Sequence, residues 1–204
     1  MIHDRERINA AGLAGVAAIF VTLWPVAVFA HVESGQVGGF LSGLGHPVSG
    51  LDHVLAMVAV GLWGAQLGAP AIWALPVAFP MMMAFGGMLG LMGMPLPGVE
   101  VGIAVSALVL GGLILGQVRL GLPAALALVA FFAVFHGHAH GTELSPGENA
   151  MLYSLGFVIA TGLLHAAGIG IGLIHRWDFG RVALRGAGFA IMAGGMFFLW
   201  GALA

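Results

Sequence analysis

The stretch VEVGIAVSALVLGGLILGQV, residues 99–118, contains one charged side chain, that of Glu100. Its length and composition match the roughly 20 apolar residues that an α-helix needs to cross a bilayer. The rest of the chain has the same character, because 60% of its 204 residues are hydrophobic, 7% are charged and none is lysine. A soluble domain cannot cover its surface with so few charges. The sequence therefore predicts an integral membrane protein.

Five other apolar spans are separated from this one and from each other by breaks rich in glycine and proline. With the first, they lie at about residues 50–68, 71–93, 99–118, 122–139, 149–174 and 182–203. Several breaks are only a few residues long, so we expect successive helices to be antiparallel neighbours. The predicted fold class is all-α, a six-helix transmembrane bundle that follows a cleavable signal peptide.

The N-terminus has the pattern of a secretory signal peptide. Residues 1–7 are mostly charged or polar, residues 8–29 are almost wholly apolar, and Ala30 completes a motif with small residues at the −3 and −1 positions. We expect residues 1–30 to be removed, which leaves 31–204 as a single transmembrane domain. An uncleaved first transmembrane helix is the alternative.

The four arginines that follow the N-terminal segment predict the orientation. Arg119 comes after the third predicted span, Arg176 and Arg181 lie between the fifth and the sixth, and Arg185 lies in the first turn of the sixth. Positively charged loops stay in the cytoplasm. All four arginines satisfy this rule when both ends of the mature chain lie outside, so we predict a multi-pass protein with periplasmic N- and C-termini.

Charge and composition also exclude several classes of function. A net charge of −2 and four widely spaced arginines give no electrostatic basis for nucleic-acid binding. A Walker-type ATP-binding loop requires a lysine, which this chain lacks. The chain also has no cysteine, so any metal ion must bind to histidine, carboxylate, methionine or backbone oxygen. Nine histidines in so apolar a chain are therefore the candidates for chemistry.

The first group of candidates lies at the outer end of the span that begins near residue 50. His46 precedes the helix across a break, and Asp52 and His53 fall in its first turn if Ser49 is the N-cap. Asp52 alone is also favourable there because of the helix dipole. Two imidazoles and a carboxylate are, however, a ligand set suited to Ni²⁺, Co²⁺ or Zn²⁺.

The second group lies in the segment FHGHAHGTE, residues 135–143. On a helix, His136, His140 and Glu143 share one face, whereas His138 points roughly the other way. The first three are therefore the better metal ligands, and His138 is a secondary candidate. Glu100 opens its own span at the same outer face and is a further candidate, although a lone acid in a first turn also suits the helix dipole.

Two other histidines are secondary candidates. His165 lies deep within the fifth predicted span, where a hydrogen bond to a neighbouring helix is the explanation we favour and an inner way-station for a metal ion is the alternative. Signal cleavage would leave His31 at the new N-terminus, where its imidazole and the α-amine together form a nitrogen chelate.

The strings HPVSGLDHVLAMVAVGLWG, residues 46–64, and FHGHAHGTE together resemble the HupE/UreJ family of nickel/cobalt permeases. The resemblance covers essentially the whole chain. It implies a secondary transporter, not an enzyme, that takes up Ni²⁺ or Co²⁺ across the bacterial inner membrane for hydrogenase or urease maturation. The metal ion is then cargo, no cofactor is permanently bound, and the lipid bilayer is the only other partner that we predict.

The resemblance also implies roles for individual residues. The His-x5-Asp-His element of the family falls on His46, Asp52 and His53, and its His-Gly-x-Glu element falls on His140, Gly141 and Glu143. The family's acid at the start of the third span falls on Glu100, and an aromatic residue of the second span falls on Phe79. His138 stands where many relatives have an aromatic residue.

Two other classes of function compete with a permease. A metal-binding protein that delivers nickel to a partner or senses it would need a sizeable soluble portion, and no loop expected here exceeds about a dozen residues. A histidine-box di-iron enzyme would need its many histidine ligands on the cytoplasmic side, whereas the histidine motifs of this chain are expected to face outward. We therefore favour transport.

Overall fold

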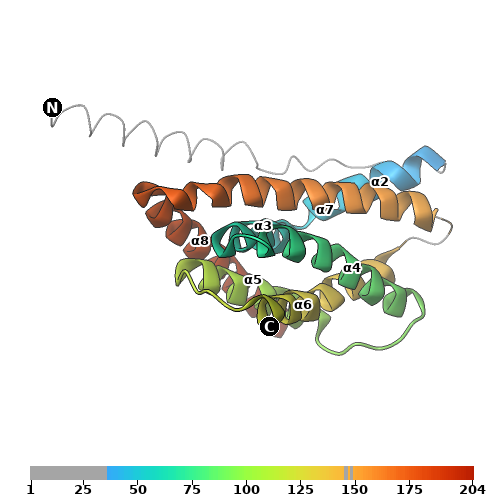
Figure 1. Cartoon of the computed structure of the whole chain (residues 1–204). Helices are drawn as coiled ribbons and strands as arrows, with labels where there is room; N and C mark the ends of the chain where they lie inside the picture. Colours follow the sequence, from blue (N-terminus) through green and yellow to red (C-terminus); the bar gives the residue numbers. More distant parts are fainter. Residues whose placement is uncertain (1–35, 145–146, 148) are drawn as a thin grey trace, which may run out of the picture. The chain divides into compact units, whose positions relative to one another are not determined.

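The computed structural model describes residues 36–144, 147 and 149–204 (Figure 1). The predicted signal peptide and His31 lie outside the described residues. Within those ranges every regular element is a helix and there is no β-strand. The all-α fold class is therefore confirmed for the described residues.

The described part of the chain contains seven α-helices and one short 3₁₀-helix. They are α2 (Gln36–Ser49), α3 (Leu51–Leu67), α4 (Ala71–Leu91), α5 (Val99–Leu115), α6 (Leu122–Glu143), α7 (Ala150–Gly172), η1 (Leu173–Arg176) and α8 (Asp178–Leu203). Six of them match the predicted spans. The fourth span, predicted at about residues 122–139, corresponds to α6, which continues through the polar segment to Glu143.

Among the described residues, four helices are long and apolar enough to cross a membrane: α4, α6, α7 with η1, and α8. The pair formed by α2 and α3 is bent by 81° and counts as a fifth candidate if it forms one broken span. α5 is apolar but has only 17 residues. Length and composition thus support a multi-pass membrane protein, while the count of six spans stays a prediction.

The bend between α2 and α3 is built from proline and glycine. Pro47 lies inside α2, and Gly50 is the residue at which the chain turns into α3. The prediction of Ser49 as the N-cap is wrong, because Gly50 occupies that position and the Ser49 hydroxyl donates instead to the carbonyl of His46 at 2.7 Å. Gly50 offers no side-chain cap to α3, and the carboxylate of Asp52 in the first turn accepts from the backbone N–H of His53.

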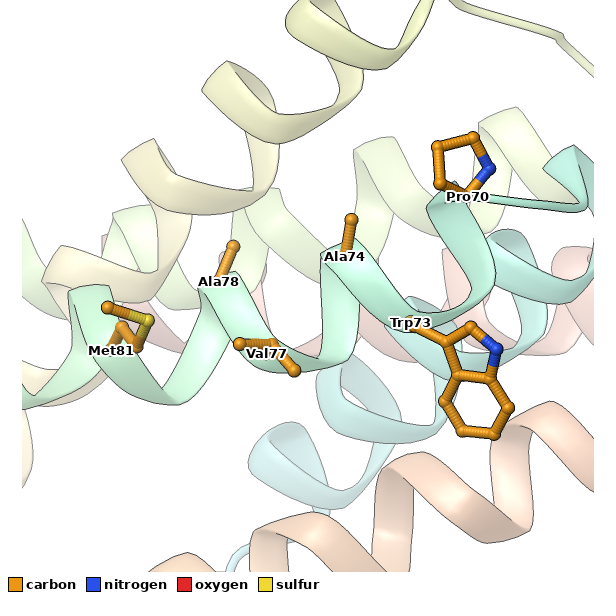
Figure 2. A pocket seen from close by; sticks show the side chains of 6 residues that line it. All are labelled: Pro70, Trp73, Ala74, Val77, Ala78 and Met81. Carbon is orange, nitrogen blue, oxygen red and sulfur yellow. The ribbon is translucent and has the colours of Figure 1, made fainter.

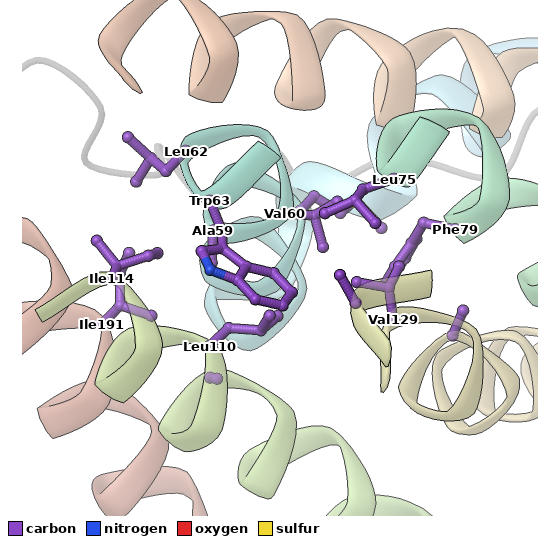
Figure 3. Close-up of a cluster of buried hydrophobic side chains, with 14 of the residues drawn as sticks. Ala59, Val60, Leu62, Trp63, Leu75, Phe79, Leu110, Ile114, Val129 and Ile191 are labelled. Carbon is purple, nitrogen blue, oxygen red and sulfur yellow. The ribbon is translucent and has the colours of Figure 1, made fainter. Parts of the chain in front are cut away.

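α3 lies at the centre of the packing and contacts α4, α5, α7 and α8. Trp63 on α3 is fully buried among apolar side chains that include Leu110 of α5 (Figure 3). Its indole N–H donates to the carbonyl of Val118 at 3.0 Å, and the guanidinium of Arg119 donates to that of Gln66 at 3.2 Å. These bonds tie the last turn of α3 to the loop before α6.

The two ends of the described helices carry different polar residues. We call the end that carries Arg119 and Arg176 the arginine end, and the end where α3 begins and α6 finishes the histidine end.

Close backbone contact holds α6 against α4, because a Cβ at Gly137 would lie 1.9 Å from the carbonyl oxygen of Met83. Only glycine permits this approach, which fixes the depth of the histidines on α6.

α4 also presents an apolar face away from the core. Trp73, Val77 and Met81 are exposed there, and with Pro70, Ala74 and Ala78 they line a hollow that has no polar side chain (Figure 2). Such a face is suited to contact with lipid. None of the six residues that line this hollow is ionisable, so the hollow is not a candidate metal site.

Candidate metal centre

The histidine end brings together residues from four helices. His46 comes from the last turn of α2, Asp52 and His53 from the first turn of α3, and the histidines of the FHGHAHGTE segment from the last turns of α6. The first turns of α7 add Tyr153 and Phe157. The sequence separations are large, so only the packing of these helices creates the cluster.

Three of these side chains form the outer site, which we define as His46, His140 and Glu143. The Nε2 atom of His46 lies 3.1 Å from Oε2 of Glu143, and Nδ1 of His140 lies 3.9 Å from the same oxygen. One ligand atom from each residue fits within 4.8 Å of the others. Two imidazole nitrogens and one carboxylate oxygen can bind a borderline divalent cation and leave positions for water.

Asp52 acts on His53 and is not a member of the outer site. Its Oδ1 atom accepts from the backbone N–H of His53 and lies 2.9 Å from the ring Nδ1 of the same residue. Because an ionised carboxylate can only accept, Nδ1 carries the proton and Nε2 keeps its lone pair. That Nε2 atom is buried and has no hydrogen-bond partner among the residues described. Carboxylates orient metal-binding histidines in this way.

The imidazole rings form a continuous row that we call the histidine row. In order from the outer site it contains His46, His140, His53 and His136. Their ring centroids are separated by 4.7 Å, 4.5 Å and 5.2 Å in turn. The side chain of His46 is 28% exposed, whereas His136 is completely buried. The row therefore leads from solvent into the interior.

His136 ends the row with a defined tautomer. Its Nδ1 atom lies 3.0 Å from the carbonyl oxygen of Phe132, one turn earlier on α6. A carbonyl only accepts, so Nδ1 must carry the proton. Nε2 is then a free lone pair in a buried position, without a hydrogen-bond partner in the described part of the chain. This is the form in which neutral imidazole binds a metal ion.

Two other predicted residues do not join the cluster. His138 points away from it, as expected from the helix period, and its Nε2 donates to the carbonyl of Met94 at 2.7 Å. Glu100 is exposed and, with Asp52 and Trp200, lines a separate pocket at the histidine end. Glu100 thus lies near Asp52 without contributing to the outer site, and a direct ligand role for it is not supported by the geometry.

The explanation favoured for His165, a hydrogen bond to a neighbouring helix, is wrong. His165 is only 2% exposed, and neither ring nitrogen has a hydrogen-bond partner among residues 36–144, 147 and 149–204. The ring instead meets the edge of Phe79 on α4, with centroids 5.4 Å apart. The neighbours recorded for His165 are the apolar ring of Phe79 and the glycine backbone at Gly61, and neither offers its imidazole a side-chain hydrogen bond.

Two aromatic residues of the site were not foreseen. The centroid of Phe157 lies 4.4 Å from that of His140, and the ring of Tyr153 lies 5.7 Å from that of His46. They form the α7 wall of the outer site. A signal was present in the sequence, because Tyr153 is the only tyrosine of a strongly apolar chain.

The comparisons with known proteins place the chain in a family. A protein-family model described as HupE / UreJ protein matches residues 18–198. The chain is 46% identical over 173 residues to Protein HupE of Rhizobium leguminosarum bv. viciae, an alignment that covers 84% of this chain and 91% of that protein. No solved structure matches the chain.

Proposed function

Because the chain belongs to the HupE/UreJ family, we propose that it is a secondary transporter that takes up Ni²⁺ or Co²⁺ across the bacterial inner membrane. The imported metal would supply hydrogenase or urease maturation. The observation that carries this proposal is the outer site, where His46, His140 and Glu143 converge at the exposed beginning of a row of buried imidazoles.

The ligand chemistry of the outer site supports a transported ion over a permanently bound one. Transport requires binding that is strong enough for entry and weak enough for release. Three protein ligands, one of them a carboxylate that is 52% exposed, form an open site that water can enter. A structural metal site would more often be closed by four protein ligands.

The order of the residues supports inward movement. Glu143 attracts the hydrated cation, and the imidazoles of His46 and His140 replace part of its water shell. His53 follows next in the row, its ring oriented by Asp52, and His136 offers a lone pair at full burial. Each transfer exchanges one nitrogen ligand for another of the same kind, which keeps successive binding energies similar.

The arrangement of charge supports uptake over export. The four arginines of the described residues lie at the end of the helices opposite the outer site, and positively charged loops face the cytoplasm. The outer site would then open toward the periplasm, and both termini of the mature chain would lie there. A Walker loop is excluded by the absence of lysine, so the metal gradient or an ion gradient would supply the driving force.

The test is uptake of radioactive Ni²⁺ by cells that lack their own nickel transporters, with unlabelled Co²⁺ and Zn²⁺ as competitors. We expect uptake with the wild-type chain, competition by Co²⁺ and a loss of most uptake with His46→Ala. His175→Ala is the matched control, because His175 lies at the arginine end, where its ring bonds to the carbonyl of Gly172. Uptake that is equal with and without the protein would refute the proposal.

A further inference from the structure

The ring of Phe79 separates two buried imidazoles that belong to different helices. Its centroid lies 5.4 Å from that of His136 on α6 and 5.4 Å from that of His165 on α7, both in edge-to-face contact. Phe79 itself is fully buried in the core (Figure 3). The histidine row therefore continues beyond His136, through one apolar ring, to a fifth imidazole.

His165 lies deeper than the outer site along α7. Phe157 contacts His140, and His165 follows eight residues later, about 12 Å further along the helix axis. Close packing fixes its position, because a Cβ at Gly61 of α3 would lie 2.3 Å from the carbonyl oxygen of His165. The imidazole is thus held at a defined depth between the histidine end and the arginine end.

The polar atoms around this position are unsatisfied. A neutral imidazole carries one donor and one acceptor, and buried polar atoms are normally hydrogen-bonded. Both nitrogens of His165 and the hydroxyl of Thr161, which is also fully buried, have no hydrogen-bond partner within the described ranges. Thr161 precedes His165 by four residues, so the two side chains share one face of α7. Two apolar side chains in place of Thr161 and His165 would avoid the free-energy cost of burying polar atoms without hydrogen bonds.

We propose that His165, with Thr161 beside it, is an interior binding station for the transported metal ion, reached from His136 past the ring of Phe79. This inference rests on the proposed transport function. The lone pair of the imidazole and the hydroxyl oxygen supply ligands where the surrounding core offers none. The Phe79 ring divides the two stations, and its π-face attracts a cation when the ring turns. An ion would therefore leave His136 only when Phe79 moves.

The first test measures initial rates of Ni²⁺ uptake into vesicles that contain the purified protein. His165→Phe keeps a ring of similar size against Phe79 and removes both unsatisfied nitrogens, so we expect folding and thermal stability to be retained. The maximal rate should fall by at least about tenfold, while the half-saturation concentration, set by the outer site, should stay unchanged. His175→Phe is the matched control and should transport at the wild-type rate.

The second test asks directly whether metal reaches this position. The chain has no cysteine, so a thiolate-to-metal charge-transfer band in His165→Cys loaded with Co²⁺ must arise from residue 165. We expect this band, and we expect it to be absent from His175→Cys under the same conditions. The measurement does not depend on transport, and it also reports on protein in detergent.

The outcomes separate this inference from the proposed function. No uptake by wild-type vesicles refutes the transport function, and the Co²⁺ band then decides the interior station alone. Wild-type rates in His165→Phe overturn the station. A reduced rate without a band in His165→Cys also overturns it, because His165 then acts only by positioning the core. A reduced rate together with the band supports it.

Discussion

Replacing Gly50 by alanine should impair transport without weakening the fold. A Cβ at this position would lie 2.8 Å from Oδ1 of Asp52 and 3.0 Å from Nδ1 of His53. Ordinary contact begins at 3.4 Å, so the two atoms must retreat by about 0.6 Å and 0.4 Å. These are the atoms of the 2.9 Å hydrogen bond that orients His53. The added methyl group therefore acts on the bond directly.

The expected magnitude follows from the role of that bond. Loss of a partner that orients a metal ligand typically costs about 10–100-fold in metal affinity or activity, and we expect Ni²⁺ uptake by Gly50→Ala to fall within this range. The backbone at Gly50 has φ −101° and ψ 116°, which alanine adopts without strain. The reduced entropy of the unfolded chain then adds about 0.4–1 kcal/mol to the free energy of unfolding, and the weakened Asp52–His53 hydrogen bond removes about 1 kcal/mol, so thermal stability should change little.

The assay is initial Ni²⁺ uptake per molecule of membrane protein, together with a thermal unfolding curve of the purified variant. Gly45→Ala is the matched control, since it adds the same methyl group to α2 and a Cβ there meets nothing within 4 Å. Wild-type uptake by Gly50→Ala would refute the reasoning. Equal impairment of the control would do so as well, because the effect could then not be assigned to the Asp52–His53 pair.

Three further outcomes test other parts of the structure. Glu143→Gln keeps the shape of the outer site and removes its negative charge, so the half-saturation concentration for Ni²⁺ should rise by at least about tenfold, and an unchanged value contradicts the assignment. His138→Ala removes the hydrogen bond to the carbonyl of Met94, so it should lower the free energy of unfolding by about 1 kcal/mol and leave Ni²⁺ uptake per folded molecule nearly unchanged. A loss of uptake as large as that of the outer-site variants would place His138 in the transport pathway. A reporter active only outside the cytoplasm should work after Ala204 and fail after Trp177, and the reverse pattern would turn the outer site toward the cytoplasm.

Properties that depend on local sequence were predictable. Hydropathy is a property of a continuous window, so the six apolar spans match six helices to within a few residues. The helical period is equally local. It placed His140 and Glu143 on one face of α6 and His138 on another, and the ion pair with Glu143 and the bond to Met94 confirm both positions.

Properties that depend on contacts between helices were not predictable in this way. The role of Asp52 as the partner of His53 depends on a 2.9 Å approach of two side chains, whereas the residue types alone allowed it to be a metal ligand or a helix-start acid. The α7 wall of the outer site arises because Tyr153 and Phe157 pack beside α2 and α6. The pattern of residues along the chain does not predict which apolar helix faces pack against one another.

Residue types and their order were enough to predict a helical membrane protein, two histidine motifs at one end of the bundle, and a resemblance to the HupE/UreJ family. Composition, helical period and short motifs are sufficient for these conclusions, because each is encoded over a few neighbouring residues. The folded arrangement was needed to see that four imidazoles form a row, that Phe79 contacts both its last member and His165, and that both nitrogens of His165 are unpaired among the described residues. Those relations depend on glycine contacts such as Gly137 against Met83, where the absence of one methyl group sets how closely two helices approach.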